Sequence, residues 1–181
     1  NITSLENYEQ AVATHTFTAN STVLAKNNRR VRTIEHLMSA LNMNGISNVL
    51  IKVDEEVPNI DGSASDFCRL IQEAGVEEQN AFVEFAVVHK HIQVGLGELD
   101  KKHLYVEPYD GFEICMRVNY PEPILEQKYI FNPEQESFSD CIAPARSFNT
   151  FANIDTAQKK GMVGSGYLNS HIIIHDGKVI N

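Results

Sequence analysis

The sequence has no excess of positive charge. Its 24 acidic residues outnumber its 15 basic residues and give a net charge of −9. Phosphate backbones are bound by basic protein faces, so the composition argues against nucleic acid as a partner. One short basic cluster exists, made of Arg29, Arg30 and Arg32. A solvated loop before a helix explains this cluster better than a contact with a substrate phosphate, because charge runs usually face water.

Long apolar runs and paired cysteines are also missing. No apolar run approaches the ~20 residues that span a bilayer, and the first residues lack a charged-then-apolar signal pattern. Cys68, Cys115 and Cys141 are far apart and have no C-x-x-C spacing, which indicates neither a disulfide framework nor a cysteine zinc site. We expect free thiols, a cytoplasmic protein without a transmembrane segment, and a monomer.

The segment Thr33–Leu41 places Glu35 beside His36 at the start of a predicted helix. Thr33 is a typical N-cap residue, and apolar residues then recur at helical spacing, which predicts a helix from Ile34 to near Gly45. At about 100° per residue, His36 falls about 200° from Ile34, away from the predicted apolar stripe of Ile34, Leu37, Met38 and Leu41. The pattern suits a general base next to a zinc ligand, and it suits a structural histidine equally well.

The first part of the chain alternates strands and helices. Strands are predicted at Ala11–Phe17, Thr22–Leu24 and Asn48–Val53, and a helix at Ser65–Ala74 that Gly75 ends as a C-cap. We expect Asp61, Gly62 and Ser63 to form a turn and cap this helix. The charged stretch 76–80 marks a domain boundary near residue 78, because strand-rich sequence follows it.

Beyond that boundary we expect an antiparallel set of strands at Phe82–Val94, His103–Glu107, Phe112–Asn119 and Lys128–Phe131. Asn132 followed by Pro133 predicts a helix that begins there and runs through Ile142. A further helix is predicted at Ile154–Lys160, and a final hairpin joins His171–His175 to Lys178–Ile180 through Asp176-Gly177.

Two histidine pairs are candidates for metal ligands. His171 and His175 have the H-x-x-x-H spacing, but on a strand they lie roughly 13 Å apart, too far to share one zinc ion. His89 and His91 lie about 7 Å apart on one side of a strand, which is also too far. Neither pair predicts a zinc site.

Four segments together resemble a known family. Thr33–Leu41 is similar to the T-x-E-H-L-x-x-A-L helix of the UDP-3-O-acyl-N-acetylglucosamine deacetylases, the zinc enzymes of lipid A synthesis. Val57–Ala64 resembles their V-P-x-x-D-G-S-A segment, and Ala145–Phe148 resembles their A-R-T-F. Gly161–Gly166 is similar to their glycine-rich loop. The resemblance spans essentially the whole chain.

The resemblance implies an α+β fold built from two small two-layer halves. Each half is a sheet covered by helices, of the ribosomal S5 domain 2-like type, and the helices pack between the two sheets. The first domain would span residues 1–78 and carry the Glu-His helix. The second would span 79–181 and include an inserted β-α-β element at 147–181, which lines an acyl channel or merely forms a core.

The resemblance also implies site roles. Glu35 would be the base that activates water held by Zn²⁺, and His36 would be one of three protein ligands. Ser147 stands where the family has threonine and would donate to the developing oxyanion, and Phe148 would face the sugar. Without the resemblance, Ser147 is a turn residue and Phe148 a core aromatic. The implied reaction is hydrolysis of the N-acetyl group of a UDP-sugar that carries an acyl chain.

The family's opening G-x-G-x-H-[ST]-G segment and its later H-K-x-x-D-x-x-G-D segment, which supplies the other zinc ligands, do not occur in this sequence. We therefore expect the chain to be the central fragment of such a deacetylase. Two alternatives stay open: a non-catalytic module that keeps the fold, and the same fold acting on another amide or sugar substrate.

Overall fold

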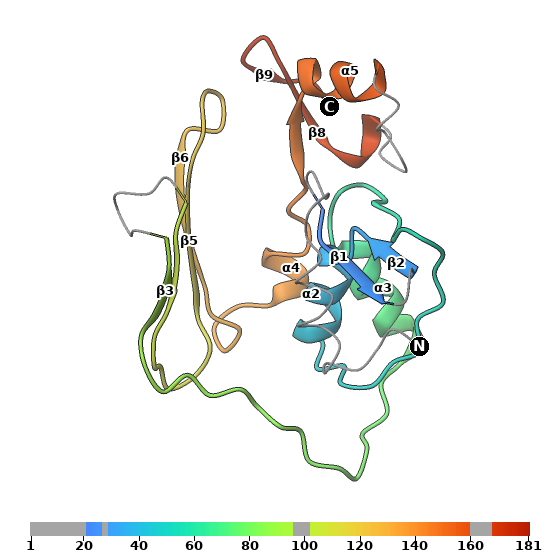
Figure 1. Ribbon diagram of the computed structural model, residues 1–181, viewed down its shortest axis with the longest axis vertical. Helices are drawn as coiled ribbons and strands as arrows, with labels where there is room; N and C mark the ends of the chain where they lie inside the picture. Colours follow the sequence, from blue (N-terminus) through green and yellow to red (C-terminus); the bar gives the residue numbers. More distant parts are fainter. Residues whose placement is uncertain (1–20, 27–28, 96–101, 160–167) are drawn as a thin grey trace.

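The computed structural model describes residues 21–26, 29–95, 102–159 and 168–181 (Figure 1). The helices are α2 (Glu35–Met43), α3 (Ser65–Ala74), α4 (Phe138–Cys141), α5 (Phe151–Lys159) and the 3₁₀ helix η3 (Leu168–Ser170). The strands are β1 (Val23–Lys26), β2 (Arg29–Arg32), β3 (Ile92–Val94), β4 (Leu104–Val106), β5 (Ile114–Asn119), β6 (Glu126–Phe131), β7 (Phe148–Thr150), β8 (Ile172–His175) and β9 (Lys178–Val179). The predicted strand Ala11–Phe17 and the glycine-rich segment 161–166 lie outside the described residues.

The main core lies where the β1–β2 hairpin meets α2 and α3 (Figure 1). Its buried members are Ile34, Ala40, Val57, Ala64, Phe67, Cys68 and Ala143. Leu24 of β1 and Val31 of β2 pack against this cluster. The apolar face of a two-stranded hairpin needs such a covering, because an isolated hairpin is marginally stable in water.

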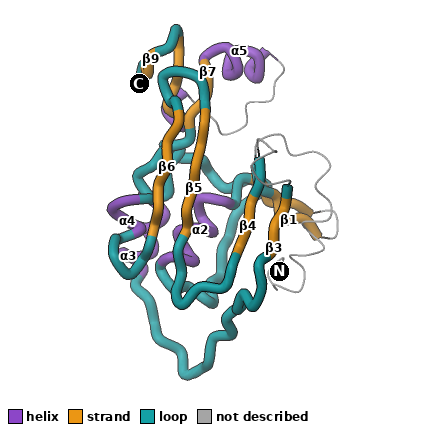
Figure 2. The backbone as a smooth tube through the Cα atoms, turned by 90° about the vertical axis from the view of Figure 1, so that its left-hand side faces the viewer, coloured by secondary structure: helices purple, strands orange, loops and turns teal. Residues whose placement is uncertain are grey.

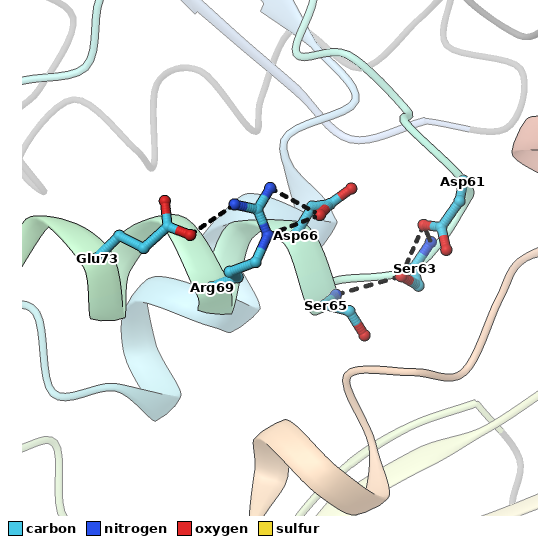
Figure 3. Close-up of polar contacts among 6 residues, drawn as sticks. All are labelled: Asp61, Ser63, Ser65, Asp66, Arg69 and Glu73. Carbon is cyan, nitrogen blue, oxygen red and sulfur yellow. Dashed lines mark hydrogen bonds and ion pairs between the residues drawn. The ribbon is translucent and has the colours of Figure 1, made fainter.

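Helix α3 has the bounds that the sequence predicts, Ser65–Ala74, and Gly75 ends it with a φ of 76°. The buried residues Phe67 and Cys68 face the core. On the exposed side Arg69 pairs with Asp66 three residues before it and Glu73 four residues after it (Figure 3). Apolar periodicity and same-face ion pairs agree here, which is why the sequence predicts this helix well.

Helix α2 begins differently from the prediction. Thr33 is not its N-cap, because Thr33 has a φ of 59° and Ile34 occupies the N-cap position without a side-chain hydrogen bond. The hydroxyl of Thr33 donates to Glu56 at 3.0 Å instead. Met38 is 44% exposed, so the predicted apolar stripe is wrong at this position. Ala40 is fully buried, and the small side chain lets α2 approach α3 closely.

The basic cluster is a strand rather than the predicted loop. Arg29 and Arg30 are exposed on β2, whereas Arg32 forms an ion pair with Glu56 at 3.0 Å. The segment 48–53 is not the predicted strand. Among the described residues, the segment that follows pairs with β2 through one parallel bridge, between Arg32 and Glu56.

The long strand predicted at Phe82–Val94 is present only as β3, and within the described part of the chain residues 82–91 belong to no helix or strand. Alternating apolar residues favour a strand, but a strand also needs a neighbour that satisfies its backbone groups, and β4 pairs only with Ile92–Val94. The other predicted strands form β4, β5 and β6. The four strands β3 to β6 make two separate antiparallel hairpins, β3–β4 and β5–β6, which Figure 2 shows side by side.

The segment after β6 holds a turn before its helix. Asn132 Oδ1 accepts a hydrogen bond from the Glu134 amide at 2.9 Å, so the predicted cap exists, but it closes a turn. Ser137 is extended and caps the short helix α4 by accepting from the Asp140 amide at 3.3 Å. A helix from Asn132 to Ile142 is therefore wrong, because the extended Ser137 interrupts it.

The last elements form a three-stranded sheet in the order β7-β8-β9. β7 and β8 are parallel, and α5, which begins three residues before the predicted Ile154, contacts both strands. The predicted hairpin is confirmed, because β8 turns through Asp176 and Gly177, both at positive φ, into β9. Among the described residues of this part, Ile154, Ile173 and Ile174 are the buried apolar side chains, and Ser170 is also buried.

Helices and small sheets thus alternate along the chain, which agrees with the predicted α+β class. The division at residue 78 and the packing of helices between two sheets stay predictions. All three cysteines are free thiols, as expected. Within the described ranges no helix is both long and apolar enough to cross a bilayer.

Candidate active site

Glu35 and His36 occupy the first turn of α2, as the sequence predicts. Glu35 Oε2 accepts a hydrogen bond from the backbone amide of Thr22 at 3.1 Å, which ties the carboxylate to the residue before β1. His36 is half-buried, and its Nε2 lies 3.4 Å from Ser147 Oγ. The tautomer of His36 decides which of the two groups donates. The structure therefore brings two predicted site residues together across 111 positions of sequence.

Two β-branched residues next to this site have strained backbones. Thr33 has a φ of 59° and Ile60 a φ of 50°, a region that such residues rarely adopt. Each conformation costs about 1–3 kcal/mol and persists only where the surroundings enforce it. For Thr33 the enforcing contact is Glu56, whose carboxylate also accepts from Arg32 at 3.0 Å. Thr33 lies two residues before Glu35, and Ile60 directly precedes Asp61.

The turn at Asp61–Ser63 is held by its own side chains (Figure 3). Asp61 Oδ1 accepts from the Ser63 amide at 3.0 Å and from the Ser63 hydroxyl at 2.7 Å, and Ser63 Oγ accepts from the Ser65 amide at 3.2 Å. Partial burial raises the pKa of the Asp61 carboxyl, but the Ser63 hydrogen bonds and the charge of Arg146 outweigh it, so the net pKa is lowered. The predicted turn is confirmed and its carboxylate is ionised, but the N-cap residue of α3 is Ala64, which has no side-chain cap.

Gly62 allows this turn to approach the segment before β8. Its φ is 86°, and a Cβ at this position would collide with the backbone carbonyl of Ser170. The Gly62 carbonyl accepts from the Ser147 amide at 2.8 Å, and the Ala64 amide donates to Ala143 at 2.9 Å. Glycine is therefore required for both conformation and space.

Ser147 is fixed by its backbone on both sides. Its amide donates to Gly62 as above, and its carbonyl accepts from the Ile172 amide at 2.8 Å, where β8 begins. Arg146 donates from Nε to the Asp61 carbonyl at 2.6 Å and from a terminal nitrogen to the carbonyls of Asn169 and His171. The Ala145–Phe148 segment is thus a junction between the Asp61 turn and the start of β8.

Phe148, the predicted substrate contact, is the first residue of β7 and is 38% exposed. Its ring packs edge-to-face on Tyr120, with centroids 5.1 Å apart and an interplanar angle of 88°. Tyr120 is 46% exposed and follows β5. This partner was not found from the sequence, because no local pattern connects the two rings. Together they present an exposed aromatic surface next to Ser147.

His171 also belongs to this site, although the sequence singled it out only as a partner of His175. It is half-buried, and its Nδ1 lies 3.1 Å from Ser170 Oγ. Burial lowers the pKa of His171, and the charges of Arg146 and His36 lower it further. His171 is therefore neutral at neutral pH. His175 lies apart on the exposed end of β8 against the Phe151 ring, so the two histidines do not form a pair.

The implied zinc ion needs three protein ligands. In the described part of the chain, no three side chains of His, Cys, Asp or Glu come together as a metal site. The predicted ligand His36 is present beside Ser147, but one imidazole does not hold zinc. The described residues alone therefore do not fit the ion.

A carboxylate and an imidazole at one helix start, with a hydroxyl facing the imidazole, are the groups of a hydrolytic active site. The sequence model of the UDP-3-O-acyl N-acetylglycosamine deacetylase family matches residues 2–181. The chain belongs to this family.

Individual relatives agree with the family match. The UDP-3-O-acyl-N-acetylglucosamine deacetylase of Helicobacter hepaticus is 34% identical over 166 residues, which is 91% of this chain and 54% of that protein. The enzyme of the same name from Psychrobacter sp. is 35% identical over 170 residues, 92% of this chain and 56% of that protein. The enzyme of the same name from Campylobacter fetus is 35% identical over 163 residues, which is 89% of this chain and 54% of that protein. The chain spans about half the length of the curated relatives it matches.

Proposed function

We propose that this chain supplies part of the active site of a zinc-dependent deacetylase in lipid A biosynthesis. The reaction is hydrolysis of the N-acetyl group of UDP-3-O-acyl-N-acetylglucosamine, the substrate that the relatives' names contain. The observation that carries the proposal is the 3.4 Å approach of Ser147 Oγ to His36 Nε2, because it joins two separate family motifs in one site. A cytoplasmic location and the two domains, 1–78 and 79–181, belong to the same proposal.

Glu35 is the proposed general base. Its carboxylate is oriented by the Thr22 amide at 3.1 Å and stands at the start of α2, where the helix dipole favours a negative charge. A carboxylate fixed in this way removes a proton from the attacking water without first having to be ordered. The proton then passes to the amine that leaves when the C–N bond of the amide breaks.

Ser147 is the proposed oxyanion donor. Its backbone is held at both the amide and the carbonyl, so its hydroxyl direction is restricted before substrate binds. A preorganised donor of this kind stabilises charge that develops on the amide oxygen. Phe148, with Tyr120 against it, offers an aromatic surface for the sugar beside this hydroxyl.

His36 is the proposed contribution of this chain to the zinc site. When bound, zinc supplies a Lewis acid that polarises the amide carbonyl and makes hydroxide available near neutral pH. Because the described residues do not form a complete ligand set, the steps assigned above are those of this chain's own side chains.

The test is Glu35→Gln in the intact protein, with turnover of the acylated UDP-sugar as the assay. Loss of the base is expected to lower kcat by about 10²- to 10⁴-fold. Glu113→Gln, an exposed glutamate at the edge of β5, is the matched control and should keep wild-type kcat. Normal turnover by the Glu35 variant contradicts the assignment. An intact wild-type protein that binds the UDP-sugar without turning it over supports the non-catalytic alternative instead.

A further inference from the structure

Arg146 connects two stretches of chain, at Asp61 and at 169–171, beside the proposed site. Its Nε donates to the carbonyl of Asp61 at 2.6 Å, and one terminal nitrogen donates to the carbonyls of Asn169 at 2.5 Å and His171 at 3.2 Å. All three acceptors are backbone oxygens. The guanidinium therefore fixes where the backbone runs. Its planar, rigid fork can reach acceptors in several directions at once, which the point charge of a lysine cannot do equally well.

The same stretches also form backbone hydrogen bonds with Ser147, the residue that follows Arg146. The Ser147 amide donates to Gly62 at 2.8 Å, one position from Asp61, and the Ser147 carbonyl accepts from Ile172 at 2.8 Å, one position from His171. Gly62 lies directly against the Ser170 carbonyl. Each stretch that Arg146 contacts therefore also contacts Ser147, the first through Gly62 and the second through Ile172. If one stretch moves, the Ser147 backbone moves with it.

We propose that Arg146 is a positioning residue, which clamps these three carbonyls and thereby holds the Ser147 hydroxyl against the His36 imidazole. The catalytic part of this inference rests on the proposed function. A hydroxyl that donates to a developing oxyanion must be placed closely, because a 1 Å displacement can lower a rate by about 100-fold. Within the described part of the chain, the hydrogen bonds of the Arg146 side chain go to backbone carbonyls, and this role needs no contact with substrate.

The test compares Arg146→Ala and Arg146→Lys with wild type in the intact protein, by amide hydrogen exchange and by steady-state kinetics. In the alanine variant we expect exchange at the Ser147 and Ile172 amides to rise by about 10- to 100-fold, as for loss of a charge-assisted hydrogen bond. Exchange at α3 amides such as Cys68 should be unchanged. We expect kcat to fall by about 10- to 100-fold with KM within about threefold. In the lysine variant, both the amide exchange and kcat should lie between the values of wild type and of the alanine variant.

Arg117→Ala is the matched control, because Arg117 pairs with Glu126 on the exposed β5–β6 hairpin and should change neither readout. Unchanged exchange and kcat in Arg146→Ala overturn the proposal. A general rise of exchange that includes α3 means that the alanine variant has lost its fold, and Arg146→Lys then decides. If the lysine variant equals wild type in both readouts, the proposal is overturned. If the wild-type protein has no turnover, the proposed function fails, and local exchange alone decides whether Arg146 positions Ser147.

Discussion

Gly62 illustrates how a single residue sets the spacing of the site. Its φ of 86° and the closeness of the Ser170 carbonyl leave no room for a side chain. Gly45 offers a comparison, since it has a φ of 69° and no atom within 4 Å of an added Cβ. The two glycines thus share a backbone conformation but differ in their surroundings.

We predict that Gly62→Ala destabilises the protein more than Gly45→Ala. Both changes place an L-residue in the left-handed region, which costs about 1–2 kcal/mol. Gly62→Ala adds an overpacking penalty of about 1–3 kcal/mol, because a backbone carbonyl must move. The free energy of unfolding, measured by denaturant titration of both variants, checks this. Equal losses in the two variants would mean that the turn and the segment at Ser170 separate easily.

Single residues of the site were predictable where they belong to a local motif. Glu35, His36, Ser147 and Phe148 are found by sequence because each lies in a recognisable segment. His171 and Tyr120 are not, since their place in the site depends on how β8 and the end of β5 approach Ser147. Thr33 shows a different failure, because Glu56, which takes its hydroxyl away from a capping role, is 23 residues distant.

At the scale of elements, one hydrogen bond connects β6 to the turn that precedes α4. Tyr129 of β6 donates its hydroxyl to Glu136 Oε2 at 2.6 Å. This hydrogen bond, together with partial desolvation and the negative charge of Glu136, raises the pKa of Tyr129 to about 12. The neutral phenol is favoured in the folded protein, because the Glu136 carboxylate accepts a hydrogen bond from it and repels a phenolate.

The predicted consequence is a loss of stability at high pH. The unfolded chain releases the Tyr129 proton near its ordinary pKa of about 10, whereas the folded protein keeps it until about pH 12. Between these values the unfolded state binds fewer protons, so the stabilising effect, complete below pH 10, is lost as pH rises. From about pH 9.5 to about pH 11.5, where Tyr129 titrates in the unfolded chain, the free energy of unfolding should decline less in Tyr129→Phe than in wild type. An equal decline of the free energy of unfolding in Tyr129→Phe and wild type would contradict the hydrogen bond between Tyr129 and Glu136.

Element predictions succeeded where one signal dominated and failed where tertiary partners decide. Helix α3 and the β8–β9 hairpin carry their own signals, apolar periodicity in one and an Asp-Gly turn in the other. Segments 48–53 and 82–91 have strand-like composition but pair with no strand among the described residues. The helix expected after Asn132 fails because a second cap, Ser137, lies five positions on and is extended.

At the scale of the whole molecule, the two hairpins β3–β4 and β5–β6 bury little of their surface. Large apolar side chains stay exposed there, among them Val94 at 67%, Leu104 at 61% and Met116 at 61%. Exposed apolar patches commonly lead to association. No contact between copies tests the expected monomer, which stays a prediction. The exposed apolar side chains favour association of the 181-residue chain instead.

We predict that the 181-residue chain self-associates with rising concentration, and that Met116→Glu weakens the association. A charge at an exposed strand position is a common protection against edge and face pairing. Sedimentation velocity over a concentration series measures the effect, and Glu113→Lys, an exposed change that removes no apolar surface, is the control. A wild-type sedimentation coefficient that stays constant across the series would contradict the prediction.

The contact between His36 and Ser147 also determines when the site can first exist during protein synthesis. Ribosomes add about 5–20 residues per second, so Ser147, 111 residues later, follows His36 by roughly 6 to 22 s. The backbone of Ser147 is completed only by the later Ile172. During this interval Glu35 and His36 stand without their hydroxyl partner. A nascent chain therefore carries the motif well before it carries the assembled site.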